Sequence, residues 1–110
     1  MEELTKNEIK TIKKEIKNNA SYKELLKYME IIGNIDRFLI LSLLNDKPCF
    51  LSDIEKNLDK NQASIAHHVR ILEKHRLIRS SKKGKFKEYS IFKETFAKLF
   101  NIWNQWFHVI

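Results

Sequence analysis

The sequence of 110 residues is 43% hydrophobic and 32% charged, so it can bury the core of one compact domain and differs from a disordered tail. The formal net charge is +7, and the only cysteine, Cys49, excludes an internal disulfide and fits a reducing compartment. The sequence shows no signal-peptide pattern, and no apolar run approaches the roughly 20 residues of a membrane span. We therefore expect a cytoplasmic protein with no membrane attachment.

The scarcity of chain-breaking residues favours a mostly helical fold with short turns, because only two glycines and one proline occur. Residues 5–17 are the first predicted helix, since isoleucines recur there at helical spacing between lysines and glutamates. These isoleucines form a narrow apolar stripe, which consists of Ile9, Ile12 and Ile16.

Two more helices are predicted before residue 45. The sequence SYKE at 21–24 has the pattern of a capping box, which would begin a helix that ends at Gly33. Asn34 then caps a helix over 35–44, which is apolar on nearly every side. A helix of this kind is usually central to the core.

A short helix, a tight turn and a longer helix follow. The short helix begins at Ser52, where Glu55 could complete a second capping box, and it ends near Asn57. Residues 58–60 form the predicted turn, and the longer helix covers 61–74 with its first residue as the cap. This order of elements is a helix-turn-helix.

The longer helix has one apolar and one polar face. Ile65, Val69 and Leu72 share the apolar face and are expected to point into the core. The polar face presents small and hydrogen-bonding side chains, which suits close approach to base edges: Gln62, Ala63, Ser64 at its margin, Ala66, His67, Arg70 and Lys74. Glutamine can bond bidentately to adenine and arginine to guanine, although Arg70 lies where a phosphate is the expected contact. The alternative is a solvated helix face without a ligand.

After Leu77 the period of the pattern changes to two, which indicates a β-hairpin. Lys83-Gly84 supplies its predicted turn, because glycine permits a positive φ. The lysines near this turn are candidates for phosphate or minor-groove contact: Lys82, Lys83, Lys85 and Lys87. The alternative is a charged loop that keeps the hairpin soluble.

The positive charge is concentrated in this same part of the chain. Residues 60–88 contain nine lysines or arginines against two glutamates, an excess equal to the net charge of the whole chain. A local patch of this kind attracts polyanions more strongly than evenly spread charge does.

The last predicted helix, 92–110, carries a seam of apolar side chains at heptad spacing along one face, and two further phenylalanines widen this face. Ordinary core, a dimer interface and a membrane-surface helix are the alternatives, and the asparagines and glutamine of the polar side argue against a membrane. A domain of this size would struggle to cover so many aromatic side chains alone, and large exposed apolar patches usually mark an interface. The predicted homodimer interface therefore comprises Ile9, Ile12, Ile16, Phe96, Leu99, Phe100, Trp103, Trp106, Phe107 and Ile110.

From Gly33 to Ile91 the order of features resembles the ArsR-type winged-helix transcription regulators, a family of microbial repressors. The residues that carry the resemblance are GNIDRFLILSLL, FLSDI, NQASIAHHVRILEKHRLI and GKFKEYSI. The resemblance implies that NQASIAHHVRIL is the DNA-reading helix, that the hairpin is the wing and that the flanking helices join two subunits.

Several departures from that family are informative. Phe50 and Ser52 stand where metal-sensing members often carry a cysteine pair. The final helix offers only Glu94 and His108 for a second metal site, and these lie about 21 Å apart along the helix axis. We therefore expect no metal site. Arg76 replaces the glycine usual before the wing, which predicts a different backbone at that corner.

Other chemistry is not expected. His68 and His75 share a helical face but lie about 10 Å apart, too far for one ion, since zinc needs three or four convergent ligands. The sequence holds no phosphate-cradling glycine loop and no cysteine with a base partner, so we expect neither enzymatic activity nor a cofactor.

The sequence therefore predicts one winged-helix domain over 1–110, with N-terminal helices at 1–32, a winged-helix core at 33–91 and a dimerisation helix at 92–110. The fold class is mostly α with a small β-hairpin. The expected function is sequence-specific binding of double-stranded DNA by a homodimeric transcriptional regulator, with repression expected over activation and an inverted-repeat operator. The alternatives are a protein-interaction module that docks through its aromatic last helix, and a regulator with a small-molecule pocket near the dimer helices.

Overall fold

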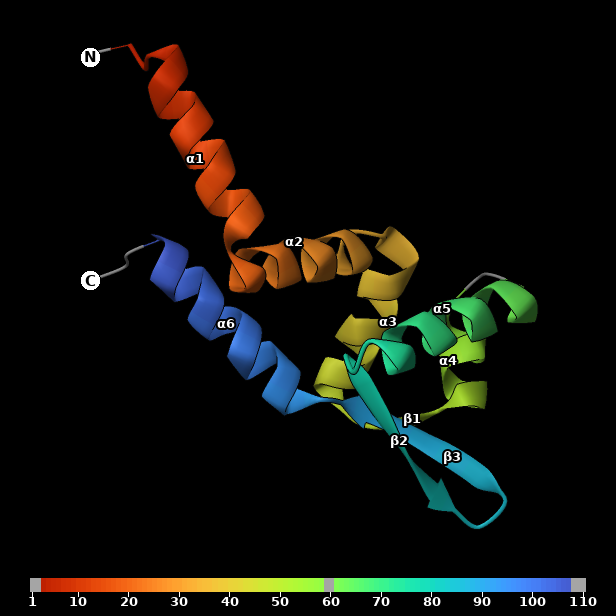
Figure 1. Ribbon diagram of the computed structural model, residues 1–110. Helices are drawn as coiled ribbons and strands as arrows, with labels where there is room; N and C mark the ends of the chain where they lie inside the picture. The colour runs from red at the N-terminus through yellow and green to blue at the C-terminus, as the bar shows by residue number, and fades with distance from the viewer. Residues whose placement is uncertain (1–2, 59–60, 108–110) are drawn as a thin grey trace.

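Six helices and a small three-stranded antiparallel sheet make up the structure, a computed structural model that describes residues 3–58 and 61–107 (Figure 1). The elements in chain order are α1 (Lys6–Asn18), α2 (Ala20–Ile32), α3 (Ile35–Asp46), β1 (Cys49–Phe50), α4 (Leu51–Asn57), α5 (Gln62–Lys74), β2 (Ile78–Lys83), β3 (Phe86–Ile91) and α6 (Lys93–Phe107). The predicted fold class is confirmed. Within the described ranges, none of the helices combines the length and apolar character that crossing a membrane requires.

Side-chain oxygens cap four of the helices. Thr5 accepts a hydrogen bond from the backbone of Glu8 at the start of α1, and Asn34 accepts two at the start of α3. Asn61 accepts the N–H of Ser64 at 2.7 Å and begins α5, as predicted. Each bond satisfies a backbone donor that the first turn of a helix leaves free.

Both predicted capping boxes are wrong. Asn19 caps α2 by accepting the N–H of Tyr22 at 3.0 Å, so the Ser21 of the first predicted box lies inside the helix. α4 begins one residue before Ser52, and the carboxylate of Asp53 accepts the N–H of Phe50 at 3.3 Å. Asn19 lies two residues before the predicted cap Ser21, and Asp53 lies two residues before the predicted acidic partner Glu55.

Gly33 ends α2 as predicted, although its φ of −69° is an ordinary right-handed value. Its N–H donates to the carbonyl of Met29 at 2.8 Å. A Cβ at position 33 would lie 3.0 Å from that same carbonyl oxygen, so the tight bend between α2 and α3 favours a residue without a side chain.

The sheet contains a strand that the sequence did not predict. β1 pairs with β3, placing Cys49 opposite Tyr89 and Phe50 opposite Glu88, and the strand order is β1-β3-β2. Two residues are too few to show a period of two, so this strand left no pattern in the sequence. Its pairing attaches the start of α4 to the base of the wing, which is the hairpin of β2 and β3.

The core lies where α3, α4, α5 and the base of the wing meet. Its most deeply buried side chains come from these elements and from the segment before the wing: Ile40, Ile54, Ile65, Leu72, Leu77 and Ile78. α3 is central to the core, as expected, and buries Ile40, Leu41 and Leu44, but its apolar character extends beyond the buried side. Ile35, Phe38 and Leu39 are each more than 40% exposed, because the sheet and α5 cover only one side of α3.

The corner between α5 and the wing is a Schellman motif. Leu77 donates to the carbonyl of Leu72 at 2.9 Å, and Arg76 donates to that of Glu73 at 3.0 Å. Arg76 has a φ of 58°, the left-handed conformation that this motif usually gives to glycine. The corner thus keeps a backbone suited to glycine even though an arginine occupies it.

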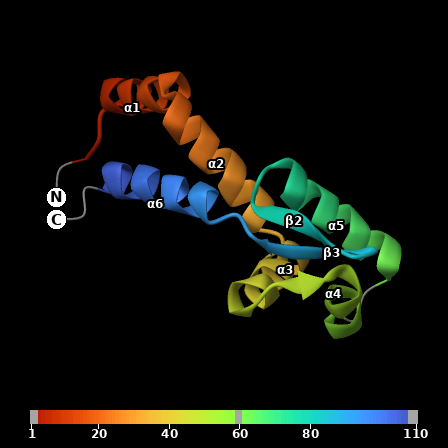
Figure 2. The same cartoon turned by 90° about the horizontal axis from the view of Figure 1, so that it is seen from below.

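The molecule is elongated, with extents of 59 × 26 × 24 Å. α1 and the end of α6 project from one end, and the wing tip lies at the other (Figures 1 and 2). The start of α5 lies at the same end as the wing tip (Figure 2).

His68 is held between α5 and α3. Its side chain is 12% exposed, its Nε2 lies 3.7 Å from Oδ2 of Asp36, and its buried Nδ1 has no hydrogen-bond partner among the described residues. Burial lowers the pKa of His68, the Arg37 guanidinium lowers it further, and the Asp36 carboxylate opposes both to a smaller extent. The folded protein therefore favours the neutral imidazole.

We predict that stability falls with acidification from pH 7.5 to pH 5.5. In the unfolded chain histidine has a pKa of about 6.5, whereas the folded pKa of His68 is lower, so its contribution is complete above about pH 6.5 and is lost as the pH falls toward the folded pKa. Burial also lowers the pKa of His75, which adds to the loss. Urea titrations should show a smaller loss in His68→Gln than in the unchanged protein. Equal losses in the two proteins would contradict this assignment.

Candidate nucleic-acid interface

The outer face of α5 is free of the core. Its apolar stripe is buried, with Ile65 1%, Val69 3% and Leu72 0% exposed. The opposite side holds the residues predicted to contact DNA, all exposed except Ser64, which is half-buried at the margin: Gln62, Ala63, Ser64, His67, Arg70 and Lys74. The packing of α5 against α3 therefore turns the predicted polar face toward solvent.

The turn before α5 is only partly described. Leu58 is buried and contributes to the core, whereas residues 59–60 of the predicted turn lie outside the described residues. Ile54 of α4 is fully buried in the same core, so α4 and α5 are both fixed to it.

The wing has a regular register from its base to its tip. Ile78 pairs with Ile91 at the base, and Lys83 pairs with Phe86 at the tip. The turn therefore consists of Gly84 and Lys85, one residue later than predicted. Gly84 has a φ of 64°, which glycine adopts at no steric cost.

Like charges face each other across the wing. Lys82 is directly opposite Lys87, so their ammonium groups extend from the same face of the hairpin. Lys82, Lys83, Lys85 and Lys87 are all exposed, and none of them forms an ion pair within residues 3–58 and 61–107. Directly opposed like charges are destabilising, so this surface favours a bound anion.

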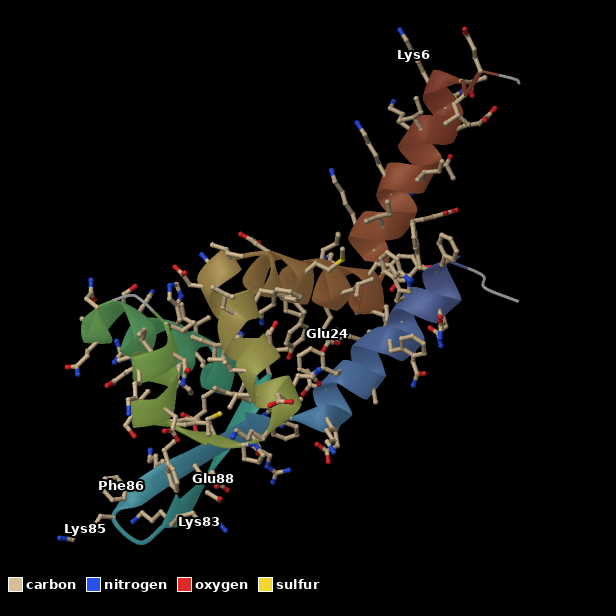
Figure 3. All side chains as sticks on the ribbon, turned by 180° about the vertical axis from the view of Figure 1, so that it is seen from behind. Lys6, Glu24, Lys83, Lys85, Phe86 and Glu88 are labelled. Atoms are coloured by element: carbon tan, nitrogen blue, oxygen red, sulfur yellow. The ribbon has the colours of Figure 1, made fainter. Side chains whose placement is uncertain are left out.

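The wing also exposes an aromatic residue that sequence reasoning did not select as a contact. Phe86 is 65% exposed beside Lys83 and Lys85 at the tip (Figure 3). Its ring meets that of Phe50 edge-on, with centroids 6.2 Å apart and planes at 70°. The sequence feature that could have identified Phe86 as a contact residue is its position between two lysines, directly after the turn.

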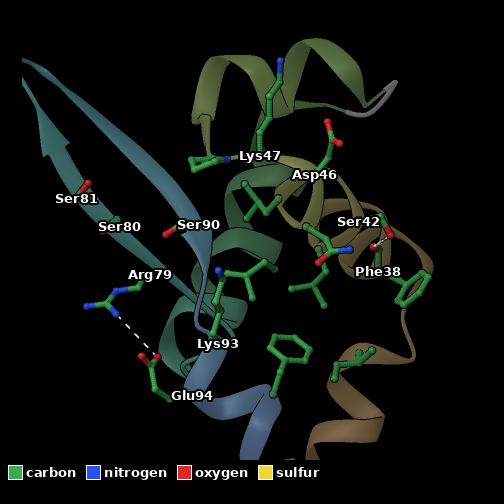
Figure 4. Close-up of a pocket in the computed structure, with 17 residues that line it drawn as sticks. Phe38, Ser42, Asp46, Lys47, Arg79, Ser80, Ser81, Ser90, Lys93 and Glu94 are labelled. Atoms are coloured by element: carbon green, nitrogen blue, oxygen red, sulfur yellow. Dashed lines mark hydrogen bonds and ion pairs between the residues drawn. The ribbon is translucent and has the colours of Figure 1, made fainter. Parts of the chain in front are cut away.

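A groove of about 970 Å³ separates the base of the wing from α3 and the start of α6 (Figure 4). Arg79 lies at its edge, with its guanidinium 4.9 Å from the ring centre of Phe92 and 4.0 Å from the carboxylate of Glu94. Both charged side chains are more than half exposed, so this ion pair contributes at most about 1 kcal/mol. Arg79 is thus directed toward α6, away from the lysines of the wing tip.

The predicted dimer residues divide into two groups on α6. Leu99 is 8% exposed and Phe96 packs against the same core, so both are covered within the protomer, together with Ile102, which the sequence analysis missed. The remaining aromatic side chains are each at least 40% exposed: Phe100, Trp103, Trp106 and Phe107. Ile110 lies outside the described residues.

The exposed rings of α6 contact one another. The centroids of Trp103 and Trp106 are 5.4 Å apart, and the ring of Phe107 stacks on that of Trp103 with an interplanar angle of 7°. The α6 helix is attached to α2 by apolar packing and by Lys98, whose Nζ lies 2.8 Å from the carboxylate of Glu24.

The predicted stripe on α1 is also exposed. Ile9 is 40% and Ile12 44% exposed, Ile16 is half-buried, and α1 buries no residue. α1 and the end of α6 therefore leave two apolar surfaces uncovered at the same end of the molecule (Figures 1 and 2).

Metal-ligating side chains do not converge in the described part of the chain, where no group of three histidine, cysteine or acidic residues could hold an ion. Burial raises the pKa of Cys49, and the carboxylate of Asp53 raises it further, so the thiol form is favoured. His108, which the sequence analysis considered as a ligand, lies outside the described residues.

Solved structures similar to this one include proteins described as transcriptional regulators. A Rhodococcus ArsR-like transcriptional regulator is 23% identical, covers 82% of this chain and 89% of its own, and has a TM-score of 0.65. HlyU from Vibrio cholerae is 16% identical, with coverages of 83% and 99% and a TM-score of 0.66. A Mycobacterium bovis domain, described as a homodimeric winged helix-turn-helix DNA-binding domain, is 19% identical, with coverages of 93% and 85% and a TM-score of 0.59. These likenesses establish the winged-helix fold.

The sequence itself matches a family over the central elements. No curated protein matches the chain. Residues 35–80, which include α3, α4, α5 and the start of β2, match the family described as bacterial regulatory protein, arsR family. The helix-turn-helix of this chain is therefore similar in sequence to that of the ArsR family of bacterial regulatory proteins.

Proposed function

We propose that this protein is a homodimeric, sequence-specific repressor whose α5 enters the DNA major groove while its wing holds the neighbouring backbone. The observation that carries this proposal is the exposed polar face of α5, which begins at the same end of the molecule as the wing tip (Figure 2). The major groove of B-DNA is about 12 Å wide and admits one α-helix. Ala63 adds little volume near the start of α5, which favours close approach to base edges.

The wing supplies charge for the phosphates. The opposed Lys82 and Lys87 repel each other in the free protein, and a phosphate between them relieves that repulsion. Lys83 and Lys85 extend the same charge to the tip. Contacts of this kind give affinity for any duplex, whereas α5 selects the sequence.

The uncovered apolar surfaces of α1 and α6 support association of two protomers. Four aromatic side chains of α6 and the isoleucines of α1 would otherwise remain in water, which is unusual for a patch of this size. The similar Mycobacterium bovis domain is described as homodimeric. Two-fold symmetry then leads to an inverted-repeat operator with half-site centres about 34 Å apart, and a dimer bound there would block access by other proteins.

Regulation in this proposal does not use a metal. The thiol of Cys49 donates to the carbonyl of Lys47 at 3.3 Å, and its raised pKa disfavours the thiolate that a metal binds. The imidazole of His68 is directed toward Asp36 between two helices.

Replacing Lys83 and Lys85 together by alanine should weaken binding to every duplex. Each lost phosphate contact removes about 0.9 from the slope of log affinity against log salt concentration, so the loss of two contacts in each protomer of the dimer should flatten the slope by about 3.6. The measurement is a fluorescence-anisotropy titration at several salt concentrations. The control, Lys6→Ala with Lys10→Ala, removes the same charge from α1 and should leave the slope unchanged.

The same titration tests the proposal as a whole. The unchanged protein should bind its selected site in the presence of random competitor duplex at moderate salt. Failure to bind duplexes of any composition at low salt would overturn DNA binding and favour a protein-interaction module.

Replacing Gln62 by alanine should change sequence preference. A bidentate contact to one base contributes about 1–3 kcal/mol of discrimination, which the variant should lose at a single base pair. Selection of sites from random DNA, followed by titration of single-base variants, measures this loss. Lys74→Ala is the control, since loss of an ammonium group at the far end of α5 should weaken all sequences alike. Uniform weakening by Gln62→Ala would exclude base reading by Gln62.

Replacing Trp103 by glutamate should separate the protomers, because a charge would replace the ring at the centre of the exposed aromatic cluster. Sedimentation velocity should show a monomer, and operator affinity should fall with it. Phe38→Glu places the same charge on an exposed aromatic position of α3 and should leave the dimer intact. A dimer that persists in Trp103→Glu would exclude this cluster as the interface.

A further inference from the structure

Phe86 is 65% exposed, the highest fraction among the described phenylalanine, tyrosine and tryptophan residues. The proposed dimer covers the exposed aromatic side chains of α6, but Phe86 lies at the opposite end of the molecule, on the wing (Figures 1 and 3). Neither the core nor the proposed dimer interface therefore explains an apolar side chain at this position.

The position of Phe86 is fixed by the fold. It is the first residue of β3, directly after the Gly84-Lys85 turn, and it pairs with Lys83. The edge-on contact with Phe50 supports one part of the ring, and Phe50 is itself anchored by its pairing with Glu88. This contact orients the ring, yet 65% of the residue stays exposed.

The residues around the ring of Phe86 suit a ligand that carries negative charges along its edges and apolar groups between them. Lys83 is paired with Phe86 and Lys85 precedes it in the turn; the half-buried Glu88 lies on the same face of β3 as Phe86, and Lys87 extends from the opposite face. The minor groove of DNA offers phosphates along both rims, with sugars and base edges between them. Proteins that bind this groove combine cationic side chains with apolar wedges such as phenylalanine.

We propose that Phe86 enters the minor groove beside each half-site and makes binding sensitive to the base pairs there, an inference that rests on the proposed function. The exocyclic amino group of guanine projects into the minor groove, whereas an A·T pair leaves that position open. The ring of Phe86 therefore favours A·T over G·C at the flanking base pairs. The neighbouring lysines contribute attraction to the phosphates that does not depend on sequence.

Inosine distinguishes a contact in the minor groove from a contact in the major groove. An I·C pair presents the major-groove pattern of G·C but lacks the amino group in the minor groove. Duplexes that carry A·T, G·C or I·C at the flanking base pairs of the selected site are titrated at one salt concentration. The unchanged protein should bind the A·T and I·C duplexes equally and the G·C duplex about tenfold more weakly.

Three variants complete the test. Phe86→Ala should bind the A·T duplex about tenfold more weakly, should bind all three duplexes alike, and should keep the salt slope of the unchanged protein, because no charge is removed. Phe86→Leu retains an apolar side chain and should keep most of the discrimination. Phe38→Ala removes an exposed ring from α3 and should change nothing.

The outcomes distinguish this inference from the proposed function. If Phe86→Ala is as stable to heat as the unchanged protein and still discriminates between the duplexes, the minor-groove role of Phe86 is overturned while DNA binding stands. Binding of I·C and G·C duplexes with equal affinity by the unchanged protein would also overturn it, since the contact would then lie in the major groove. Absence of binding to all duplexes by the unchanged protein would overturn the proposed function itself.

Discussion

The packing of α5 against α3 is the contact on which the other features of the candidate interface depend. Ile65, Val69 and Leu72 are almost completely buried, so α5 has one rotational setting about its axis. A rotation that exposed these side chains would lose about 1.5–3 kcal/mol for each one. The same setting presents Gln62 and Arg70 to solvent. The buried side chains of α5 thus determine which of its other side chains are exposed for contact with DNA.

The wing is stabilised at its base and electrostatically strained at its tip. Ile78, Tyr89 and the pairing with β1 hold the base, whereas Lys82 and Lys87 repel each other further out. Burial at the base offsets the repulsion at the tip, so the hairpin can hold several cations close together without a bound anion. A surface of this kind is prepared for a phosphate backbone before binding, which lowers the cost of ordering it in the complex.

The two proposed interfaces, for DNA and for the second protomer, lie at opposite ends of the elongated molecule. The aromatic end of α6 and the stripe of α1 lie at one end, and the wing tip lies at the other (Figure 1). The middle of α6 is packed into the core through Leu99 and Ile102. The residue before α6, Phe92, is joined to the base of the wing, because its N–H donates to the carbonyl of Leu77 at 3.0 Å. A change in the position of α6 would therefore alter the position of the wing, because the two are connected by a hydrogen bond and by core packing.

The sequence alone determined the features that depend on neighbouring residues. The Asn61 cap, the stripe of Ile65, Val69 and Leu72 and the period of the wing are local, so α5 and the hairpin were predicted nearly to the residue. Contacts between distant segments decided the rest. The pairing of β1 with β3, nearly forty residues apart in the chain, left no sequence period.

Tertiary structure also decided which apolar side chains are covered. Leu99 and Trp103 both belong to the predicted seam of α6, yet only Leu99 reaches the core, because Ile102 and not Trp103 continues its buried face on the next turn. Phe86 had the spacing of an ordinary strand residue, and its exposure at the tip follows from how far the hairpin extends beyond the sheet. Burial is a property of the surroundings of a residue, and a single sequence specifies those surroundings only through the complete fold.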